Sequence, residues 1–522
     1  MTTQKAKGVV AAGDRLTAAA GAEVLAHGGN AVDAAIASMT TAFVSEPALT
    51  GPLGGGFAVV AGPESLPKAY HFFANAPRQT PSGPDNQLDF HGLDVDFGST
   101  TQTFHVGRGA AAVPLILEGI KTLHHEQGKL ALKEVLTQCR TSASHGIPLS
   151  KGQLNFIRVL TPILSLTPES RSLFIDEVEE NGQVIFPGLV RLIDALIDDR
   201  LDEVYHDLAE HFSSPHGQLS QSDFKKLKVE SCEPLIIPFR DNEIIMPGLP
   251  TSAGALIAFG LELWSRSPVP SDLASFHQQF AAIASLTMDY RINHFDPLLR
   301  SKDAVWDRES IDFTYWEAQF KKRLASASIR PSPMERKGNG STTHVSVVDS
   351  DGMACAITTS NGEGCGHIVP GWDVMANNFM GESDLHPNGF HTSQPGQALT
   401  SMMCPTIIRS PHGMYALGTG GSNRIRTALL QIIYRLLVLG QRPDEAVAAP
   451  RAHFEGELFC YEVNGSDGQS GIELTDERYF NDVKLAPFPQ ANMYFGGVHI
   501  ASPHTTSVGD LRRYGAVASS SR

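Results

Sequence analysis

The junction Ser341-Thr342-Thr343-His344 places hydroxyl side chains where a polar segment meets an apolar strand. The preceding residues 325–341 are rich in Pro, Ser and Gly, which predicts an exposed loop. The hydroxyl of Thr342 could attack the carbonyl before it, move the acyl group from nitrogen to oxygen, and leave an ester for hydrolysis. The new chain would start with a threonine whose α-amine, with a pKa of about 8, can serve as general base. A threonine-rich strand start has the same pattern.

A second candidate for chemistry is the pair Gly420-Gly421, which stands directly before a predicted helix at 424–439. Backbone N–H groups in such a place, together with the positive end of the helix dipole, can stabilise a developing oxyanion. A plain tight turn is the alternative. The run Gly54-Gly55-Gly56 is not a phosphate-binding loop, because no Lys-Ser/Thr pair follows it, and we expect it to permit close backbone packing.

Charged side chains offer two further candidates. Glu382 and Asp384 could bind a substrate cation, although an acidic loop turn is the ordinary interpretation. His124, His125 and Glu126 have the side-chain types of metal ligands. Adjacent histidines point apart on a helix, however, so a solvated face is the expectation there. We therefore expect neither a metal site nor a cofactor.

The elements that must position these residues follow from the hydrophobic pattern. Residues 14–28 predict a helix that ends at Gly28-Gly29, and a second helix starts near Asn30. A glycine-rich turn at 51–56 then leads into an apolar strand at 57–60. The first part of the chain thus alternates helix and strand.

The strongest β signal is the segment 343–359, which alternates around the turn Ser350-Asp351-Gly352 and predicts a hairpin. The same patterns predict mainly helical stretches at 115–136 and 152–230, strands at 234–247, 404–409 and 413–418, and helices at 252–266, 273–292 and 423–439. Strands at both ends with helices between them predict a layered α/β protein that does not split into sequential domains.

The composition is that of a globular protein, since 42% of the 522 residues are hydrophobic and 19% are charged. The net charge of -15 argues against nucleic acid or an anionic membrane as a partner, because both need a basic surface. No signal peptide is visible, and no apolar stretch approaches the roughly 18 residues that span a bilayer. The six cysteines are scattered and predict reduced thiols. A soluble cytoplasmic protein is the expectation.

Eight segments, taken together in this order, resemble the gamma-glutamyltranspeptidase family. They are GGNAVDAAIASMTTAFVSEPALTGPLGGGFAVV at 28–60, GQLSQSDFKKLKVE at 217–230, PGLPTSAGALIAFGLELW at 247–264, STTHVSVVDSDGMA at 341–354, LTSMMCPTII at 399–408, LGTGGSNRIRTALLQII at 417–433, EAVAAPRAHFE at 445–455 and GDLRRYGA at 509–516. Each segment alone is a weak signal, but the combination spans nearly the whole chain and is very specific.

The resemblance implies the fold of N-terminal-nucleophile hydrolases, an α/β protein built as a four-layer αββα sandwich. It implies self-cleavage between Ser341 and Thr342, which would give a large chain 1–341 and a small chain 342–522 that interleave as one domain. It makes Thr342 the nucleophile and implies no cofactor.

The resemblance also assigns catalytic roles around the nucleophile. Ser360 falls where the family has a second hydroxyl that supports the nucleophile, with Thr359 as its neighbour. Gly420 and Gly421 fall on the glycines that form the oxyanion site.

Further roles concern the substrate. Thr400 and Ser401 occupy the adjacent pair of hydroxyl residues that contact the substrate carboxylate. Glu382 falls on the acidic residue that holds the substrate's α-amine, where the family usually has Asp.

The sequence departs from the family in its substrate-binding residues. The family has an Arg that pairs with the γ-glutamyl α-carboxylate, and here the candidates are Arg78, several residues early, and Arg108. Ser82 stands near the expected place. Asn361 can act as the family's Asn only with a one-residue gap, and Phe379 replaces a polar residue.

The resemblance predicts an enzyme that transfers or hydrolyses γ-glutamyl groups of amides such as glutathione through an acyl-enzyme on Thr342. An alternative keeps this machinery with another acyl donor, as in the family's cephalosporin-acylase and polyglutamate-processing relatives. A catalytically inactive binding descendant is a third hypothesis, and the retention of Thr342, Gly420 and Gly421 counts against it. The expected partners are a small-molecule amide or peptide substrate and the two chains of one precursor. The chain could also form a homodimer.

Overall fold

The computed structural model describes most of the chain. The described residues are 7–79, 87–96, 101–225, 227–299, 305–326, 341–386, 389–468 and 483–520. Among them, no helix combines the length and the apolar character needed to cross a membrane. The loop expected at 325–341 lies almost entirely outside the described residues.

The two N-terminal helices begin at residues that cap them. Helix α1, Arg15–Ala26, follows Asp14, whose side chain accepts a hydrogen bond from the N–H of Leu16. Helix α2, Ala31–Ser45, begins with a capping box in which Asn30 and Asp33 each accept from the other's backbone N–H. Every residue of α2 is buried, so this helix lies inside the protein.

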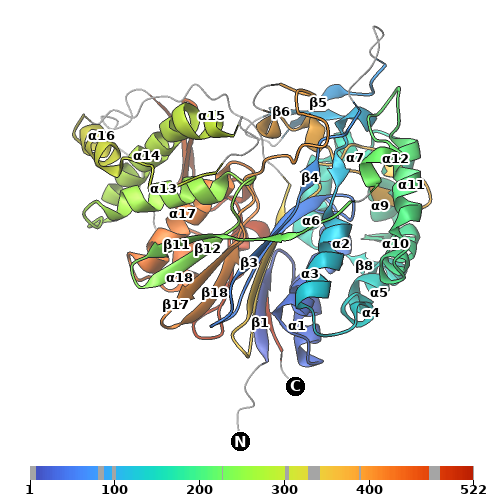
Figure 1. Ribbon diagram of the computed structural model, residues 1–522, viewed down its shortest axis with the longest axis horizontal. Helices are drawn as coiled ribbons and strands as arrows, with labels where there is room; N and C mark the ends of the chain where they lie inside the picture. The colour runs from blue at the N-terminus through green and yellow to red at the C-terminus, as the bar shows by residue number, and fades with distance from the viewer. Residues whose placement is uncertain are drawn as a thin grey trace, which may run out of the picture.

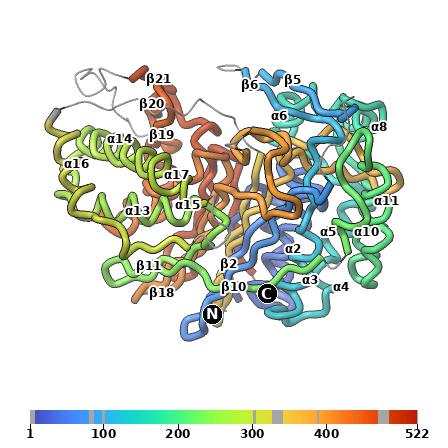
Figure 2. The backbone as a smooth tube through the Cα atoms, turned by 45° about the horizontal axis from the view of Figure 1, so that its top comes forward, coloured from blue at the N-terminus to red at the C-terminus, as the bar shows by residue number. Residues whose placement is uncertain are grey.

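The first sheet has seven strands in the order β10-β3-β2-β14-β13-β1-β23. Their bounds are β1 Gly8–Ala12, β2 Gly55–Ala61, β3 Lys68–Phe72, β10 Ser231–Cys232, β13 Thr343–Asp349, β14 Ala354–Ser360 and β23 Ala516–Ser519. All neighbours are antiparallel. Strands β1 and β23 pair with each other, so the two ends of the chain meet in this sheet (Figure 2).

The second sheet has five strands in the order β11-β12-β17-β18-β22, again antiparallel. Their bounds are β11 Leu235–Phe239, β12 Asn242–Met246, β17 Thr406–Ser410, β18 Gly413–Gly418 and β22 His499–Ala501. Segments before and after residue 341 contribute strands to both sheets, so the two parts of the chain are interleaved.

Small side chains fill the space between the two sheets. This inner core consists of Val9, Ala11, Val59, Ala61, Ala69, Ile245, Val348, Ala354, Ala356, Ile407, Met414, Ala416 and Ala501. Because so many of these residues are alanine, the backbones of the two sheets approach closely, and β18 packs against β13 and β14.

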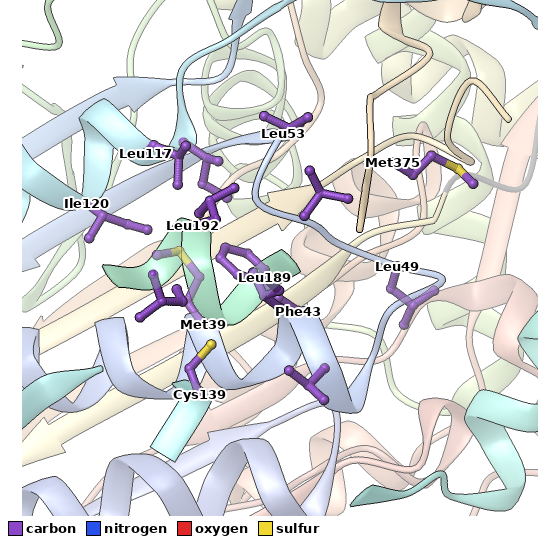
Figure 3. Close-up of a cluster of buried hydrophobic side chains, with 14 of the residues drawn as sticks. Met39, Phe43, Leu49, Leu53, Leu117, Ile120, Cys139, Leu189, Leu192 and Met375 are labelled. Atoms are coloured by element: carbon purple, nitrogen blue, oxygen red, sulfur yellow. The ribbon is translucent and has the colours of Figure 1, made fainter. Parts of the chain in front are cut away.

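Helices cover the outer faces of both sheets (Figure 1). On the first sheet, α1 and α2 are backed by α3 Ile116–Gln127, α5 Thr137–His145 and α10 Pro187–Ile197. Met39 and Phe43 of α2 meet Leu117, Cys139 and Leu189 of these helices in one apolar cluster (Figure 3). On the second sheet lie α13 Ala253–Ser265, α14 Leu273–Tyr290 and α17 Arg424–Leu437. The expected four-layer αββα sandwich is confirmed.

Further helices and strands complete the fold. The helices are α4 Leu132–Val135, α6 Lys151–Val159, α7 Thr161–Leu164, α8 Pro168–Arg171, α9 Glu177–Asn181, α11 Leu201–His211, α12 Gln221–Phe224, α15 Asp296–Leu298, α16 Phe313–Ser326 and α18 Pro443–Ala448. The strands are β4 Ala74–Asn75, β5 His91–Asp96, β6 Thr101–Val106, β7 Val113–Pro114, β8 Ile147–Pro148, β9 Gln183–Val184, β15 Ile368–Val369, β16 Val374–Met375, β19 Ala452–Glu455, β20 Leu458–Glu462 and β21 Lys484–Phe488.

Candidate active site

Strand β13 determines which way Thr342 faces. Side chains alternate along a strand, and Thr343 points to the outer layer, where its hydroxyl donates to Glu46 at 2.6 Å. His344 points the other way, onto Gly418 of β18, where an added Cβ would lie 2.3 Å from the His344 ring. Thr342 precedes the strand directly and therefore lies on the face that His344 occupies.

Hydrogen bonds hold Ser341 at both its carbonyl oxygen and its N–H. The hydroxyl of Ser360 donates a hydrogen bond of 2.5 Å to the carbonyl oxygen of Ser341. The N–H of Gly362 donates to the same hydroxyl at 2.9 Å, which orients it. The N–H of Ser341 donates to Oε1 of Glu363 at 3.1 Å. Ser341, Ser360 and Glu363 are all buried.

Gly420 and Arg513 contact the carbonyl oxygen of Thr342. A Cβ added to Gly420 would lie 2.1 Å from this oxygen, so only glycine fits there. Arg513 Nη1 donates to the same oxygen at 3.3 Å. Gly421 has a φ of +127°, which L side chains rarely adopt. Gly420 therefore approaches the backbone of Thr342 closely, and Gly421 adopts a backbone conformation that favours glycine.

A buried carboxyl supports the start of β13 from the outer layer. Glu46 follows α2 and accepts hydrogen bonds from Thr17 Oγ1 at 2.7 Å and from Thr343 Oγ1. Burial, with a smaller contribution from Asp14, raises the pKa of Glu46 from its ordinary 4.5 to about 7. Helix α2 and strand β13 are thus joined next to Thr342.

A small cavity of about 40 Å³ opens beside the Ser341–Thr342 peptide bond. Its lining comes from segments far apart in the chain: Phe73, Ser252, Arg291, Ser341, Thr342, Ser360, Phe379, Glu382, Asp384, Leu385, Thr400, Ser401, Met402, Met403, Ser422, Asn423 and Ile425. Ser422 and Asn423 precede α17 directly, so the N-terminal, positive end of that helix lies at the cavity.

Three acidic side chains lie at or beside this cavity. Burial raises the pKa of Glu363 to about 8 and the pKa of Asp384 to about 6. Burial, then the neighbouring Glu363 and Asp384, raise the pKa of Glu382 well above its ordinary value. Among the described residues, Oε1 of Glu382 has no hydrogen-bond partner. A cation bound in the cavity would favour the ionised form of Glu382 and offset this upward pKa shift.

A buried arginine lies at the same cavity. Arg291 begins a short π-helical turn, Arg291–Phe295, that continues from α14. Its Nε pairs with Asp296 at 3.3 Å, and its positive charge counteracts the upward pKa shift of Asp384. The cavity thus combines a buried guanidinium group with buried carboxyl groups.

The structure brings most of the predicted site residues together. Ser341, Thr342, Ser360, Glu382, Thr400 and Ser401 line one cavity, and Gly420 lies next to the backbone of Thr342, with Gly421 following it in the chain. Asn361 lies outside the cavity lining, where its Nδ2 donates to the carbonyl of Met375 at 3.2 Å.

The two predicted arginines lie elsewhere. Arg78 is exposed and packs against Gly396, whereas Arg108 is half-buried near His211. Neither of these described residues lines the cavity. Ser82 is outside the described residues.

Three of the charged residues at or beside this site were not singled out from the sequence. Arg291 gave no signal, because only tertiary packing brings the end of α14 to the cavity. Glu363 was visible within the segment SNGEG, which departs from the family pattern, and the structure shows that this acid is buried. Arg513 stood within the C-terminal segment GDLRRYGA, where two adjacent arginines could have suggested a contact to the site.

Side chains of the types that bind metals have ordinary partners or lie exposed on the surface. His124 Nε2 contacts the carbonyl of Leu130 at 2.8 Å, and Glu126 pairs with Lys68 at 2.7 Å. Within the described residues, His206, Asp207 and Glu210 of α11 have potential ligand atoms within 4.8 Å of one another. Asp207 accepts a hydrogen bond from Trp372 Nε1, and the other two are exposed on the helix surface.

The four layers, with the cavity beside the start of a central strand, define the N-terminal-nucleophile type of hydrolase fold. The crystal structure of a cephalosporin acylase from Bacillus halodurans has this fold, with a TM-score of 0.73 at 19% identity over 98% of this chain and 96% of that one. The family model described as Gamma-glutamyltranspeptidase matches residues 17–519. The chain therefore belongs to the gamma-glutamyltranspeptidase family and is an enzyme of the hydrolase and transferase kind.

Two curated relatives show the range of this family. The Acylase ACY 1 proenzyme of Pseudomonas sp. (strain V22) is 28% identical over 477 residues, covering 86% of this chain and 83% of that protein. The Glutathione hydrolase proenzyme of Pseudomonas aeruginosa is 27% identical over 472 residues, with the same coverage of 86% and 83%. Relatives at similar sequence identity thus carry two different activity names, acylase and glutathione hydrolase.

Proposed function

We propose that this enzyme cuts itself between Ser341 and Thr342 and then uses Thr342 to hydrolyse or transfer γ-glutamyl groups of amides such as glutathione. In the cut, the Thr342 hydroxyl oxygen bonds to the Ser341 carbonyl carbon, the C–N bond breaks, and the hydroxyl proton passes to the nitrogen. Water then hydrolyses the ester, which separates a large chain 1–341 from a small chain 342–522. In each later turnover the free α-amine of Thr342 acts as the base for its own hydroxyl.

The observation that carries this proposal is the 2.5 Å hydrogen bond from Ser360 Oγ to the carbonyl oxygen of Ser341. A carbonyl that accepts such a bond is polarised, and the same donor stabilises the charge that develops on its oxygen during attack. Thr342 follows this carbonyl directly and lines the same cavity. The donor, the electrophile and the nucleophile are thus next to one another before any cut.

The charged groups of the cavity favour a zwitterionic acyl group. A γ-glutamyl group has an α-ammonium and an α-carboxylate, and each needs a partner when it leaves water. Glu382 suits the ammonium, because its Oε1 is buried without a partner in the described chain. Arg291 suits the carboxylate, because a guanidinium can bind a carboxylate through two parallel N–H groups. Thr400 and Ser401 would donate to the same carboxylate.

The size of the cavity supports a cut before substrate binds. A volume of about 40 Å³ holds about one water molecule, and a γ-glutamyl group is several times larger. Ser341 occupies the space beside the Ser360 hydroxyl. We therefore expect Ser341 to leave this place after the cut and to open the acyl pocket.

A second candidate function keeps the same chemistry with a less polar acyl group. Phe73, Phe379, Met402 and Met403 also line the cavity and give it an apolar wall. Phe379 stands where the family has a polar residue. An aliphatic or aromatic acyl chain with a terminal carboxylate, paired to Arg291, would fit this wall without using Glu382.

Three p-nitroanilide donors that differ in the charged groups at the far end of the acyl chain separate these candidates. The γ-glutamyl donor has both charges, the glutaryl donor lacks the ammonium, and the 4-aminobutyryl donor lacks the carboxylate. The γ-glutamyl function predicts the highest kcat/KM for the first donor. A higher kcat/KM for the glutaryl donor would favour the second candidate, and failure of the purified protein to turn over any amide donor would contradict both.

A further inference from the structure

We infer that Glu363 is a positioning residue for self-cleavage: its side chain holds the N–H of Ser341 and thereby sets the direction of the carbonyl that Thr342 attacks. The inference rests on the proposed self-cleavage. It adds a residue to which neither the motifs nor the resemblance to the family gives a role.

The first step of the argument concerns the two peptide planes that meet at Ser341. The N–H of Ser341 belongs to the plane before its α-carbon, and the carbonyl belongs to the next plane, which contains the scissile bond. Glu363 Oε1 fixes the first plane at 3.1 Å and Ser360 Oγ fixes the second at 2.5 Å. Rotation about both backbone bonds of Ser341 is therefore restricted, so its carbonyl carbon keeps one face toward Thr342.

One tight turn supplies both of these contacts. Ser360 ends β14, and the N–H of Gly362 donates to its hydroxyl. Gly362 has a φ of +59°, which turns the chain so that Glu363 comes back toward Ser341. The N–H of Glu363 donates to Asn378 Oδ1 at 2.9 Å, which anchors the far end of the turn. The turn thus presents the hydroxyl of Ser360 as a donor and the carboxyl of Glu363 as an acceptor. These two groups bind the carbonyl oxygen and the N–H of the same residue, Ser341.

The protonation state of Glu363 determines which substitution preserves its hydrogen bond to Ser341. Burial raises the pKa of this carboxyl to about 8, so it is mostly neutral near pH 7. A neutral acid and a glutamine side chain have the same net charge and each offer a carbonyl-type oxygen to the N–H of Ser341. A methionine has a similar length but no comparable acceptor, and it would leave a buried N–H without a partner.

The experiment compares Glu363→Gln with Glu363→Met in the full chain. Protein is made in a cell-free system, synthesis is stopped, and conversion of one chain into two is followed on denaturing gels. We expect Glu363→Gln to cleave near the wild-type rate and Glu363→Met to cleave roughly 10- to 100-fold more slowly, because small misplacements of reacting groups cost about this much. Cys365→Ala is the matched control, since Cys365 is buried two residues further along without contacting Ser341.

The outcomes separate this inference from the proposed function. Wild-type cleavage in Glu363→Met, or equally slow cleavage in Glu363→Gln and Glu363→Met, would overturn the role of Glu363. Slow cleavage in Cys365→Ala would do the same, because it would assign the effect to packing of the turn. Cleavage of Thr342→Ala at the same bond would instead overturn the proposed self-cleavage, whatever the Glu363 variants do.

Discussion

The α-carbon of Gly420 lies against the carbonyl oxygen of Thr342, so closely that an added β-carbon would be 2.1 Å from that oxygen. A side chain at position 420 must therefore push the backbone of Thr342 away, together with the start of β13. This close contact links Thr342, at the start of β13, to the N-terminal end of α17, which covers the other sheet.

From this contact we predict that Gly420→Ala loses both self-cleavage and turnover while the protein still folds. Removal of one oxyanion donor typically lowers turnover roughly 100- to 1000-fold, and displacement of the nucleophile adds to this loss. Gly421→Ala should act in the same direction through its φ of +127°. Gly248→Ala is the control, because a Cβ there meets no atom within 4 Å. Wild-type kcat in Gly420→Ala would assign the oxyanion role to other residues.

Ser360→Ala should slow the cut between Ser341 and Thr342 by a similar factor, because the scissile carbonyl loses its donor. Thr359→Val is the matched control. Thr359 lies one residue earlier on β14, and its hydroxyl accepts from Thr50 at 2.9 Å. The measurement is the rate of conversion to two chains. Equal rates in the two variants would mean that the Ser360 contact has no part in the cut.

The acyl pocket predicts a specific pattern of Michaelis constants. Arg291→Met should raise KM for the γ-glutamyl donor roughly 10- to 100-fold, the cost of losing a hydrogen bond to a charged group. It should leave KM for the 4-aminobutyryl donor nearly unchanged, since that donor has no carboxylate. Glu382→Gln should raise KM for the γ-glutamyl and 4-aminobutyryl donors, which have an ammonium. It should leave KM for the glutaryl donor nearly unchanged. Arg78→Met and Arg108→Met should resemble the wild type, and a large effect of either would move the carboxylate contact there.

The buried carboxyl of Glu46 predicts a pH dependence of stability. Its pKa is about 7 in the folded protein and 4.5 ordinarily, so the folded state binds the proton more tightly. Its contribution to stability is then complete below pH 4.5 and disappears as the pH rises to about 7, a change on the order of 3 kcal/mol. In an uncut Thr342→Ala background, the melting temperature should fall more from pH 5 to pH 8 with Glu46 than with Glu46→Gln. Parallel curves would show that Glu46 does not titrate in this range.

Much of the fold could be predicted from local sequence patterns. The alternation at 343–359 predicted β13 and β14, and Asp14 and Asn30 marked the starts of α1 and α2, because caps and strand periodicity depend only on nearby residues. The stretch at 152–230 was predicted as mainly helical, and the structure divides it into short helices.

The substrate end of the site could not be predicted in the same way. Arg291 reaches the cavity only because α14 packs against α13 and β19, and no local pattern encodes that packing. Arg78 and Arg108 were both candidates from their positions in the chain, and neither of these described residues lines the cavity. Motif order therefore directed attention to the segment around Thr342, which lines the cavity, whereas charge complementarity in the pocket depended on the three-dimensional arrangement.

The mass of the purified protein under denaturing conditions tests the central claim most directly. For the wild type we predict two chains, the second beginning with Thr342, and for Thr342→Ala a single uncut chain, because no hydroxyl remains to attack the Ser341 carbonyl. An uncut wild-type chain that still turns over amide donors, or a Thr342→Ala chain split at the same bond, would contradict the proposal that Thr342 is the nucleophile.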